Sequence, residues 1–319
     1  MVQEPVIQYK KLSDGQKMFT KYWSITGKKI KGTILVIHGL GETADYYDEF
    51  SLFASTHGFD MIVPELRGHG RTAGDILNHE YGGGNPGTDS LHKMADDISL
   101  LATEKKAKFP SLPVFLLGHS MGSVVAQLAV IRHGELFDGL LLTGIPSAEN
   151  AGELLEILDD EISRRGPKAK CQDTFNVLFS GVNEPFEPVK TPLDWITSDD
   201  EMIRESLALP YTAVLFTNEF YHDFLTAQLE IQEKESLLNV PKQLPVFFLA
   251  GEKDVMAHNG KAAEEKQRLF RDLGLSNTQF KIYPGLRHSI LREKSRDQVM
   301  DDLLHWIELR LKIRVCRTE

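Results

Sequence analysis

Cysteine, positive charge and long apolar runs are all scarce in this 319-residue sequence. It has only 2 Cys, and its 46 acidic residues outnumber its 36 basic ones, which gives a formal net charge of -10. Cys171 and Cys316 lie far apart and have no Cys or His companions at metal-ligand spacing, so no zinc site is indicated and a reducing compartment is favoured. The acidic balance argues against non-specific nucleic-acid binding through a broad basic surface.

No stretch reaches the roughly 18 consecutive apolar residues that a membrane-spanning helix needs. Residues 1–19 also lack the apolar core of a secretory signal peptide. We therefore expect a cytoplasmic protein with neither a signal peptide nor a transmembrane segment. The composition, 41% hydrophobic and 26% charged, is that of a globular protein, and the length suits one large domain with an insertion or two domains.

Short runs rich in β-branched residues and leucine recur along the sequence, and each ends in a turn that contains glycine. Such runs, apolar on both faces, are typical of strands buried on both sides of a parallel sheet. Segments with helical periodicity lie between them, which predicts an α/β fold whose ligand site lies beyond the carboxyl ends of the strands. The predicted strands are 33–37, 61–63, 114–117, 139–142, 246–250 and 280–283, and the predicted helices are 91–109, 120–133 and 260–273.

One stretch of about a hundred residues interrupts this alternation. Residues 146–244 show helical and loop patterns punctuated by proline, but no convincing strand. An insertion at the carboxyl edge of the sheet would cover the site as a cap. We therefore divide the chain into a first core part at residues 1–145, a helical cap or lid at 146–243 and a second core part at 244–319.

Gly118-His119-Ser120-Met121-Gly122 matches G-x-S-x-G, the pattern of a nucleophile elbow. A predicted strand precedes it and a buried helix follows it. In that geometry Ser120 lies on a tight turn with its hydroxyl above the sheet, and the two glycines let the strand and the helix approach closely. The alternative is a glycine-rich turn whose serine only caps the helix. A phosphate-binding loop does not fit, since neither Gly-Lys-Ser/Thr nor G-x-G-x-x-G follows a strand here.

A serine nucleophile needs a general base and a carboxylate that orients the base. Among the histidines after Ser120, only His288 follows a predicted strand within a few residues, which places it on a loop at the carboxyl edge. Asp254 follows the strand at 246–250 by a short turn and reaches the same edge. Glu252 is the alternative acid, and the alternative role for Asp254 is that of a helix cap or a simple loop carboxylate.

Acyl transfer also requires hydrogen-bond donors for the developing oxyanion. One donor is expected to be the backbone N–H of Met121, directly after the nucleophile. The other is expected to be the N–H of Leu40, in the loop after the first of the predicted strands. His38 and His69 lie in neighbouring loops, and we expect them to brace the backbone because no paired metal-ligand spacing accompanies them.

Taken together, these motifs resemble the α/β-hydrolase superfamily, and within it the serine hydrolases of the monoacylglycerol lipase and lysophospholipase-like branch. The resemblance covers about residues 33–306 and rests on HGLGE at 38–42, RGHGR at 67–71, GHSMG at 118–122, GEKD at 251–254 and YPGLRH at 283–288. It implies an α/β-hydrolase fold: a mostly parallel sheet flanked by helices, with a mainly helical cap inserted after the sixth strand. It also implies that Ser120, His288 and Asp254 hydrolyse a single-acyl-chain ester through an acyl-enzyme intermediate, without a cofactor or a metal.

The head-group elements of that branch are only partly present. Monoacylglycerol lipases tend to continue the first motif as H-G-x-G-E-H, with an Arg shortly after. Here Glu42 is present, but Thr43 replaces the His and Tyr46 stands where the Arg is expected. Glu42 is therefore a candidate substrate-binding residue, while the sequence does not specify the rest of a glycerol pocket.

Apolar residues recur at helical spacing in the cap. They predict one apolar helix face that either packs on the core or lines an acyl tunnel and rests on a lipid surface, as the cap of monoacylglycerol lipases does. For an acidic protein, such contact with a membrane would be hydrophobic and weak. Phe216 and Phe220 are the candidate substrate-binding residues of this face, which comprises Leu209, Ala213, Phe216, Phe220 and Phe224.

Three functions fit these patterns. The first is hydrolysis of a monoacylglycerol or a lysophospholipid. The second keeps the same triad but acts on short esters or small peptides, and an aminopeptidase would need a cap carboxylate to hold the ammonium group of its substrate. The third is a non-catalytic binding module, which the presence of all the catalytic elements disfavours. The cap carboxylates are Glu184, Glu187, Asp194, Asp199, Asp200 and Glu201.

Overall fold

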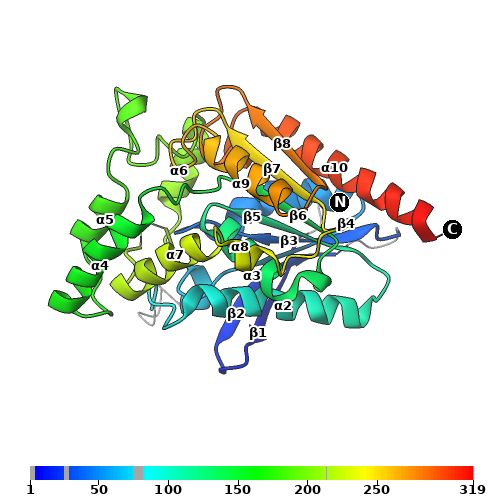
Figure 1. The fold of residues 1–319 in the computed structure, drawn as a ribbon, viewed down its shortest axis with the longest axis horizontal. Helices are drawn as coiled ribbons and strands as arrows, with labels where there is room; N and C mark the ends of the chain where they lie inside the picture. The colour runs from blue at the N-terminus through cyan, green and yellow to red at the C-terminus, as the bar shows by residue number, and fades with distance from the viewer. Residues whose placement is uncertain (1–3, 25–28, 75–81, 213, 319) are drawn as a thin grey trace.

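The computed structural model describes residues 4–24, 29–74, 82–212 and 214–318, with side chains through Ile313. Its centre is an eight-stranded sheet in the order β1-β2-β4-β3-β5-β6-β7-β8 (Figure 1). Strands β3 to β8 form the parallel part of the sheet, whereas β1 with β2 and β2 with β4 pair antiparallel. The strands are β1 (Val6–Lys11), β2 (Lys17–Trp23), β3 (Gly32–Ile37), β4 (Phe59–Pro64), β5 (Val114–His119), β6 (Gly139–Thr143), β7 (Val246–Gly251) and β8 (Thr278–Tyr283).

Helices flank this sheet, and those between β6 and β7 extend beyond one end of it (Figure 1). The mostly parallel α/β sheet expected from the sequence is thereby confirmed. In the part of the chain that the structure describes, no helix is both long and apolar enough to cross a membrane. The α-helices are α1 (Asp48–Thr56), α2 (Ser90–Lys108), α3 (Met121–His133), α4 (Ala151–Arg165), α5 (Gln172–Leu178), α6 (Asp200–Ala208), α7 (Asn218–Glu230), α8 (Lys234–Leu237), α9 (Lys261–Asp272) and α10 (Arg296–Thr318).

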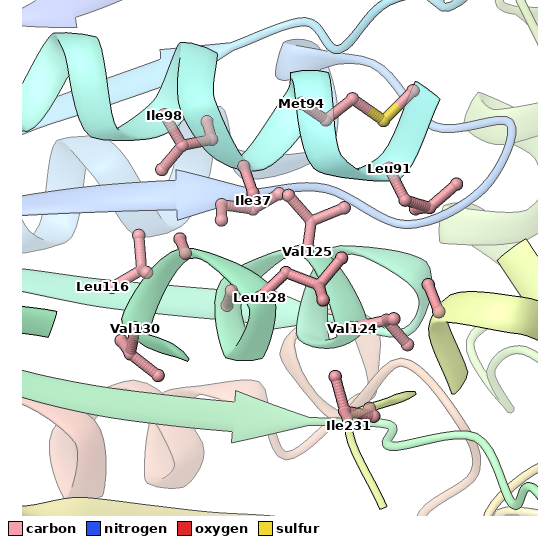
Figure 2. Close-up of a cluster of buried hydrophobic side chains, with 14 of the residues drawn as sticks. Ile37, Leu91, Met94, Ile98, Leu116, Val124, Val125, Leu128, Val130 and Ile231 are labelled. Atoms are coloured by element: carbon pink, nitrogen blue, oxygen red, sulfur yellow. The ribbon is translucent and has the colours of Figure 1, made fainter. Parts of the chain in front are cut away.

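Alternate side chains of each central strand enter different hydrophobic cores, because successive residues of a strand point to opposite faces. On β3, Ile34 and Val36 belong to the hydrophobic cluster that includes side chains of α1 and α10, whereas Leu35 and Ile37 belong to the cluster that includes side chains of α2, α3 and α9. Figure 2 shows Ile37 next to Val125 of α3, with side chains of α2 above them. Burial on both faces fixes the strands that carry the site, each large side chain contributing about 1.5–3 kcal/mol.

Strands β1 and β2 were absent from the sequence prediction. Neither has a continuous apolar run, since each mixes lysines with apolar residues. β1 is an edge strand whose Val6, Ile7 and Tyr9 are exposed, and a tight turn closed by Leu12 N–H to Gln16 O, 2.8 Å, joins it to β2. Periodicity identifies strands that are buried on both sides better than antiparallel strands at an edge.

The insertion between β6 and β7 contains only helices and loops in its described residues, as the sequence suggested. It does not form an isolated unit, because α7 contacts α2 and α3. Phe220, Tyr221 and Leu225 of α7 belong to the same hydrophobic cluster as the core helices. The proposed domain boundaries at 145 and 243 stay a prediction.

The predicted apolar face from Leu209 to Phe224 is wrong as a single helix. Helix α6 ends at Ala208, before Pro210, and α7 begins only at Asn218, where the Thr217 side chain caps it by accepting the Phe220 N–H. Proline and the capping threonine interrupt the helix that the spacing suggested. Of the other residues predicted for this face, Phe216 directly precedes Thr217 and so lies outside α7, and Ala213 lies outside the described residues.

Candidate active site

The turn between β5 and α3 holds Ser120 in a backbone conformation that few side chains adopt. Its φ is 53° and its ψ is -123°. The Ser120 N–H donates to Thr143 O over 3.0 Å, and the Ser123 N–H donates to Ser120 O over 2.8 Å, which keeps the turn in place. Such strain, supported by its surroundings, is typical of functional sites.

The two glycines of the motif are required by close backbone contacts. A Cβ on Gly118 would lie 2.4 Å from the Gly122 carbonyl oxygen, and a Cβ on Gly122 would lie 2.2 Å from the Ile37 carbonyl oxygen. Strand β5, helix α3 and the end of β3 therefore approach more closely here than any side chain allows. This is the geometry of a nucleophile elbow.

His288 and Asp254 lie side by side beneath the surface. Nδ1 of His288 is 2.9 Å from Oδ1 of Asp254, and the two residues are 2% and 0% exposed. The loops that carry them follow β8 and β7 and are joined by the Lys253 N–H, which donates to Leu286 O over 2.8 Å. With Nδ1 donating to the carboxylate, Nε2 is left as the acceptor, and among the described residues it is a buried atom without a hydrogen-bond partner.

The alternative acid, Glu252, does not contact the imidazole. Its Oε2 accepts the Gly285 N–H over 2.8 Å, and its side chain is exposed. Asp254, by contrast, is fixed by the Ala257 N–H, which donates to Oδ1 over 3.2 Å. Of the two carboxylates that the sequence offered, only Asp254 is therefore in position to orient His288.

Glu42 lines the cavity above Ser120, but its carboxylate is already engaged. Oε2 accepts hydrogen bonds from the Gly39 N–H, 2.8 Å, and the Tyr47 hydroxyl, 2.9 Å, and Oε1 lies 3.7 Å from Nε2 of His119. Burial alone would raise the pKa of Glu42, but His119 and these donors lower it below its usual value. Glu42 therefore braces the turn that carries Leu40.

His119 is a site residue that the sequence reasoning did not single out. Its ring centroid lies 4.9 Å from that of His288, and its nitrogens contact Thr143 Oγ1 and Ser289 Oγ, each at 3.0 Å. Burial lowers the pKa of His119 to about 4, so the ring is neutral at physiological pH. It thus contacts the imidazole of His288 without placing a positive charge beside it. Its place within the GHSMG motif was the only available signal.

His38 and His69 brace the surrounding loops, in agreement with the expectation from the sequence. Nε2 of His38 accepts the Leu66 N–H over 2.9 Å, and Nδ1 lies 2.8 Å from Gly39 O. Nδ1 of His69 lies 2.9 Å from Arg67 O. Burial lowers the pKa of both rings. Among the described residues, no cluster of three or more His, Cys, Asp or Glu side chains could hold a metal ion.

A cavity of about 410 Å³ extends from these groups into the cap. Leu40, Ser120 and His288 line one part of it, and aromatic and aliphatic side chains line most of the rest. Phe216 is among these residues, whereas Phe220 packs behind it against His69 and does not line the cavity. The apolar cap residues of the wall are Phe175, Phe179, Val182, Leu193, Trp195, Ile196, Leu207, Val214, Leu215, Phe216 and Phe224.

The charged lining of this cavity is sparse. Of the described residues that line it, none is Lys, Arg or Asp, and Glu42 is the single carboxylate. None of the six cap carboxylates considered from the sequence reaches it. Asp194, for example, accepts hydrogen bonds from the N–H groups of Lys190 and Thr191, 2.7 and 3.1 Å away.

Comparisons with known proteins identify the family. The sequence profile of the family described as serine aminopeptidase, S33, matches residues 28–295. Monoglyceride lipase of Mus musculus is 33% identical over 306 residues, which cover 94% of this chain and 89% of that protein. The monoglyceride lipase homolog of monkeypox virus is 25% identical over 303 residues, which cover 94% of this chain and 97% of that protein.

Solved structures agree with these sequence matches. A highly thermostable carboxyl esterase from Bacillus coagulans, solved in complex with glycerol, aligns with a TM-score of 0.88 at 25% identity, over 97% of this chain and 99% of that chain. Monoglyceride lipase from Saccharomyces cerevisiae has the same fold, with a TM-score of 0.76 over 97% of this chain and 96% of that chain. The resemblance inferred from the motifs is confirmed: the chain belongs to the α/β-hydrolase family described as serine aminopeptidase, S33, and is a homologue of the monoglyceride lipases.

Proposed function

We propose that this protein is a serine hydrolase that cleaves the ester bond of a monoacylglycerol. The coarser assignment, a carboxylic ester hydrolase of the α/β-hydrolase family, follows from its relatives, which include monoglyceride lipases and a carboxyl esterase. The observation that carries the finer assignment is the cavity itself, which joins Ser120 and His288 to a long apolar wall and offers almost no charge. Such a cavity suits one acyl chain and a neutral polar head.

In the proposed reaction, Oγ of Ser120 attacks the ester carbonyl carbon while Nε2 of His288 takes its proton. The oxyanion that forms accepts hydrogen bonds from the backbone N–H groups of Leu40 and Met121. His288 then gives its proton to the glycerol oxygen as the ester C–O bond breaks, which leaves an acyl-enzyme. A water molecule repeats these steps on the acyl-enzyme, releasing the fatty acid and restoring Ser120, while Asp254 keeps the imidazole oriented throughout.

The small number of charged side chains that line the cavity favours a monoacylglycerol over the alternative substrates. A lysophospholipid carries a phosphate that is normally bound by Arg or Lys, and of the described lining residues none is cationic. A peptide substrate would bring an ammonium group, and Glu42, the single lining carboxylate, already accepts hydrogen bonds from Gly39 and Tyr47. A short-chain ester would leave much of the apolar wall without contact, so its binding would be weaker.

The test compares fatty-acid release from a monoacylglycerol and from a lysophosphatidylcholine of the same chain length, with Ser120→Ala as the blank. We expect the monoacylglycerol to be preferred at least tenfold in kcat/KM, a difference of about 1.4 kcal/mol. Preference for the lysophosphatidylcholine would overturn the head-group assignment. A folded wild-type protein whose Ser120 does not react with a fluorophosphonate would overturn the serine mechanism.

A further inference from the structure

A segment of the cap, residues 194–199, runs along the loop that carries His288. The Ser289 N–H donates to Ile196 O over 2.8 Å, and the His288 N–H reaches Trp195 O at 3.5 Å. In the other direction, Oγ1 of Thr197 donates to Arg292 O over 2.8 Å. The backbone around the base is therefore held from the cap side.

Glu293 fastens the two segments together. It is fully buried, and its two oxygens are used separately. Oε2 accepts hydrogen bonds from the N–H and the hydroxyl of Ser198, at 3.1 and 2.5 Å, and Oε1 accepts the Arg287 N–H over 2.9 Å. The Arg287 guanidinium in turn donates to the carbonyl oxygens of Asp194 and Thr197. Removing one partner of these bonds would leave a buried carboxylate or a buried N–H group without a partner, which is unfavourable, so the two segments are held firmly together.

This attachment places the Trp195 ring directly against the base. The ring centroids of Trp195 and His288 are 4.9 Å apart, with 39° between the planes. The His119 ring contacts the same imidazole, also at 4.9 Å. Asp254 binds Nδ1, so the imidazole is held by one hydrogen bond and two rings. Nε2, the atom that would take the proton, is itself buried and has no hydrogen-bond partner among the described residues.

We propose that Trp195 is a positioning residue for the general base, and that Glu293 keeps it in place by fastening residues 194–199 to the base loop. The proposal rests on the assignment of His288 as the base. Trp195 limits rotation of the imidazole, so that Nε2 stays directed at the Ser120 hydroxyl. The cap thus takes part in the chemistry of ester cleavage as well as in substrate binding.

A purely binding role for this segment makes a different prediction. Trp195 also lines the cavity, so it could act only as a wall for the acyl chain. Replacing a residue that only lines the cavity should change the kinetics of long-chain esters. It should have little effect on hydrolysis of p-nitrophenyl acetate, whose acetyl group is too short to reach along the cavity. A positioning residue affects both substrates equally, because both need the same proton transfer.

The experiment measures kcat and KM of Trp195→Ala, Trp195→Phe and Glu293→Gln with p-nitrophenyl acetate and with a long-chain monoacylglycerol. Trp195→Ala should lower kcat between about tenfold and a hundredfold for both substrates, the loss expected from a misplaced catalytic group. Trp195→Phe should recover most of the activity, because it restores an aromatic ring. KM for p-nitrophenyl acetate should stay within about twofold of wild type.

Glu293→Gln tests the attachment itself. A glutamine can accept with one oxygen only, so its amide group would face an N–H donor and the segment would loosen. We expect a loss of kcat for both esters, in the same direction as Trp195→Ala. Asp200→Asn is the matched control, because Asp200 follows the segment, is exposed and makes only a 3.5 Å ion pair with Lys190. Thermal unfolding verifies that each variant is folded, and Ser198→Ala, which removes one hydroxyl only, replaces Glu293→Gln if that variant does not fold.

Each outcome has a defined meaning. If folded Trp195→Ala keeps its kcat with p-nitrophenyl acetate and loses affinity only for the long-chain ester, Trp195 is a wall and the positioning role is overturned, while the proposed function stands. If the wild type reacts with neither ester nor a fluorophosphonate, the proposed function fails and the positioning role fails with it. Equal losses on both esters, reversed by phenylalanine, support the proposal.

Discussion

The backbone N–H of Gly39 donates a hydrogen bond to Oε2 of Glu42 over 2.8 Å and so closes the turn that carries Leu40. A Cβ on Gly39 would lie 3.2 Å from Cβ of Ser120, which shows how closely this turn packs against the candidate nucleophile. The carboxylate expected to bind a substrate head group is therefore bound to the protein's own backbone. Its position governs where the Leu40 N–H lies relative to Ser120.

Replacing Glu42 should consequently affect turnover more than binding. Glu42→Ala removes Oε2, the single oxygen that accepts hydrogen bonds from both the Gly39 N–H and the Tyr47 hydroxyl. We expect kcat to fall about tenfold with little change in KM, since the oxyanion donor shifts. Tyr47→Phe serves as the comparison, because it removes one donor and keeps the Gly39 bond, and its loss should be smaller. A raised KM at unchanged kcat would instead assign Glu42 to the head group.

The choice between the two candidate acids can be decided by a matched pair of substitutions. Asp254→Asn should lower kcat by about 10⁴, because an amide beside Nδ1 favours the wrong imidazole tautomer. Glu252→Gln should leave kcat within about twofold, because Glu252 is exposed and contacts only the Gly285 N–H. Steady-state kinetics with p-nitrophenyl acetate measures both. Near-normal turnover of Asp254→Asn would refute the assignment of the acid.

Phe220 and Phe216 should respond differently to truncation. Phe220 is fully buried behind Phe216, so Phe220→Ala should lower the free energy of unfolding by about 3–5 kcal/mol and leave the preference for acyl-chain length unchanged. Phe216 lines the cavity, so Phe216→Ala should also alter that preference. Urea unfolding and a series of esters of increasing chain length measure the two effects. A shifted chain-length profile in Phe220→Ala would restore it as a substrate-binding residue.

His92, near the start of α2, contacts Asp89, which precedes the same helix, and Glu230 at the end of α7, at 2.6 and 2.7 Å. Burial alone would lower the pKa of His92, but the two carboxylates raise it above its usual value. The contribution of protonated His92 to the free energy of unfolding is therefore fully present below about pH 6.5 and is lost as the pH rises through the raised pKa of His92. His92→Gln should lower the free energy of unfolding by about 0.5–1 kcal/mol at pH 6, allowing for solvent screening, and by less at pH 9. Urea unfolding at the two pH values checks this, and a pH-independent difference would contradict it.

Much of the fold could be predicted because its strands are buried on both sides. The runs at 33–37 and 114–117 are apolar except for Thr33 and are buried at every residue, and their predicted ends lie within two residues of the observed ones. Helices α2, α3 and α9 agree with the sequence prediction equally well. Strands β1 and β2, the antiparallel part of the sheet, were missed because they lack such runs. In the cap, the spacing of apolar residues suggested one continuous helix. The observed helices are instead separated by a segment that contains Pro210 and ends at Thr217, the N-cap of α7, because a proline and a helix-capping residue can end a helix even where the apolar periodicity continues.

The sequence by itself determined the chain order of the chemical groups. A serine between two glycines, then an aspartate, then a histidine, each after a buried strand, restricts these side chains to one edge of a parallel sheet, because the carboxyl ends of such strands meet there. This is a local and one-dimensional signal, and it also sufficed to identify the family that the comparisons confirm.

The tertiary structure alone decided which groups touch. It brings Asp254 rather than Glu252 to His288, commits Glu42 to the Gly39 turn and keeps the cap carboxylates out of the cavity. It also places Trp195, about a hundred residues away in sequence, against the imidazole. Contacts of this kind depend on how the cap and the loops that follow different strands pack together. Packing between residues far apart in the sequence produces no periodic pattern from which it could be predicted.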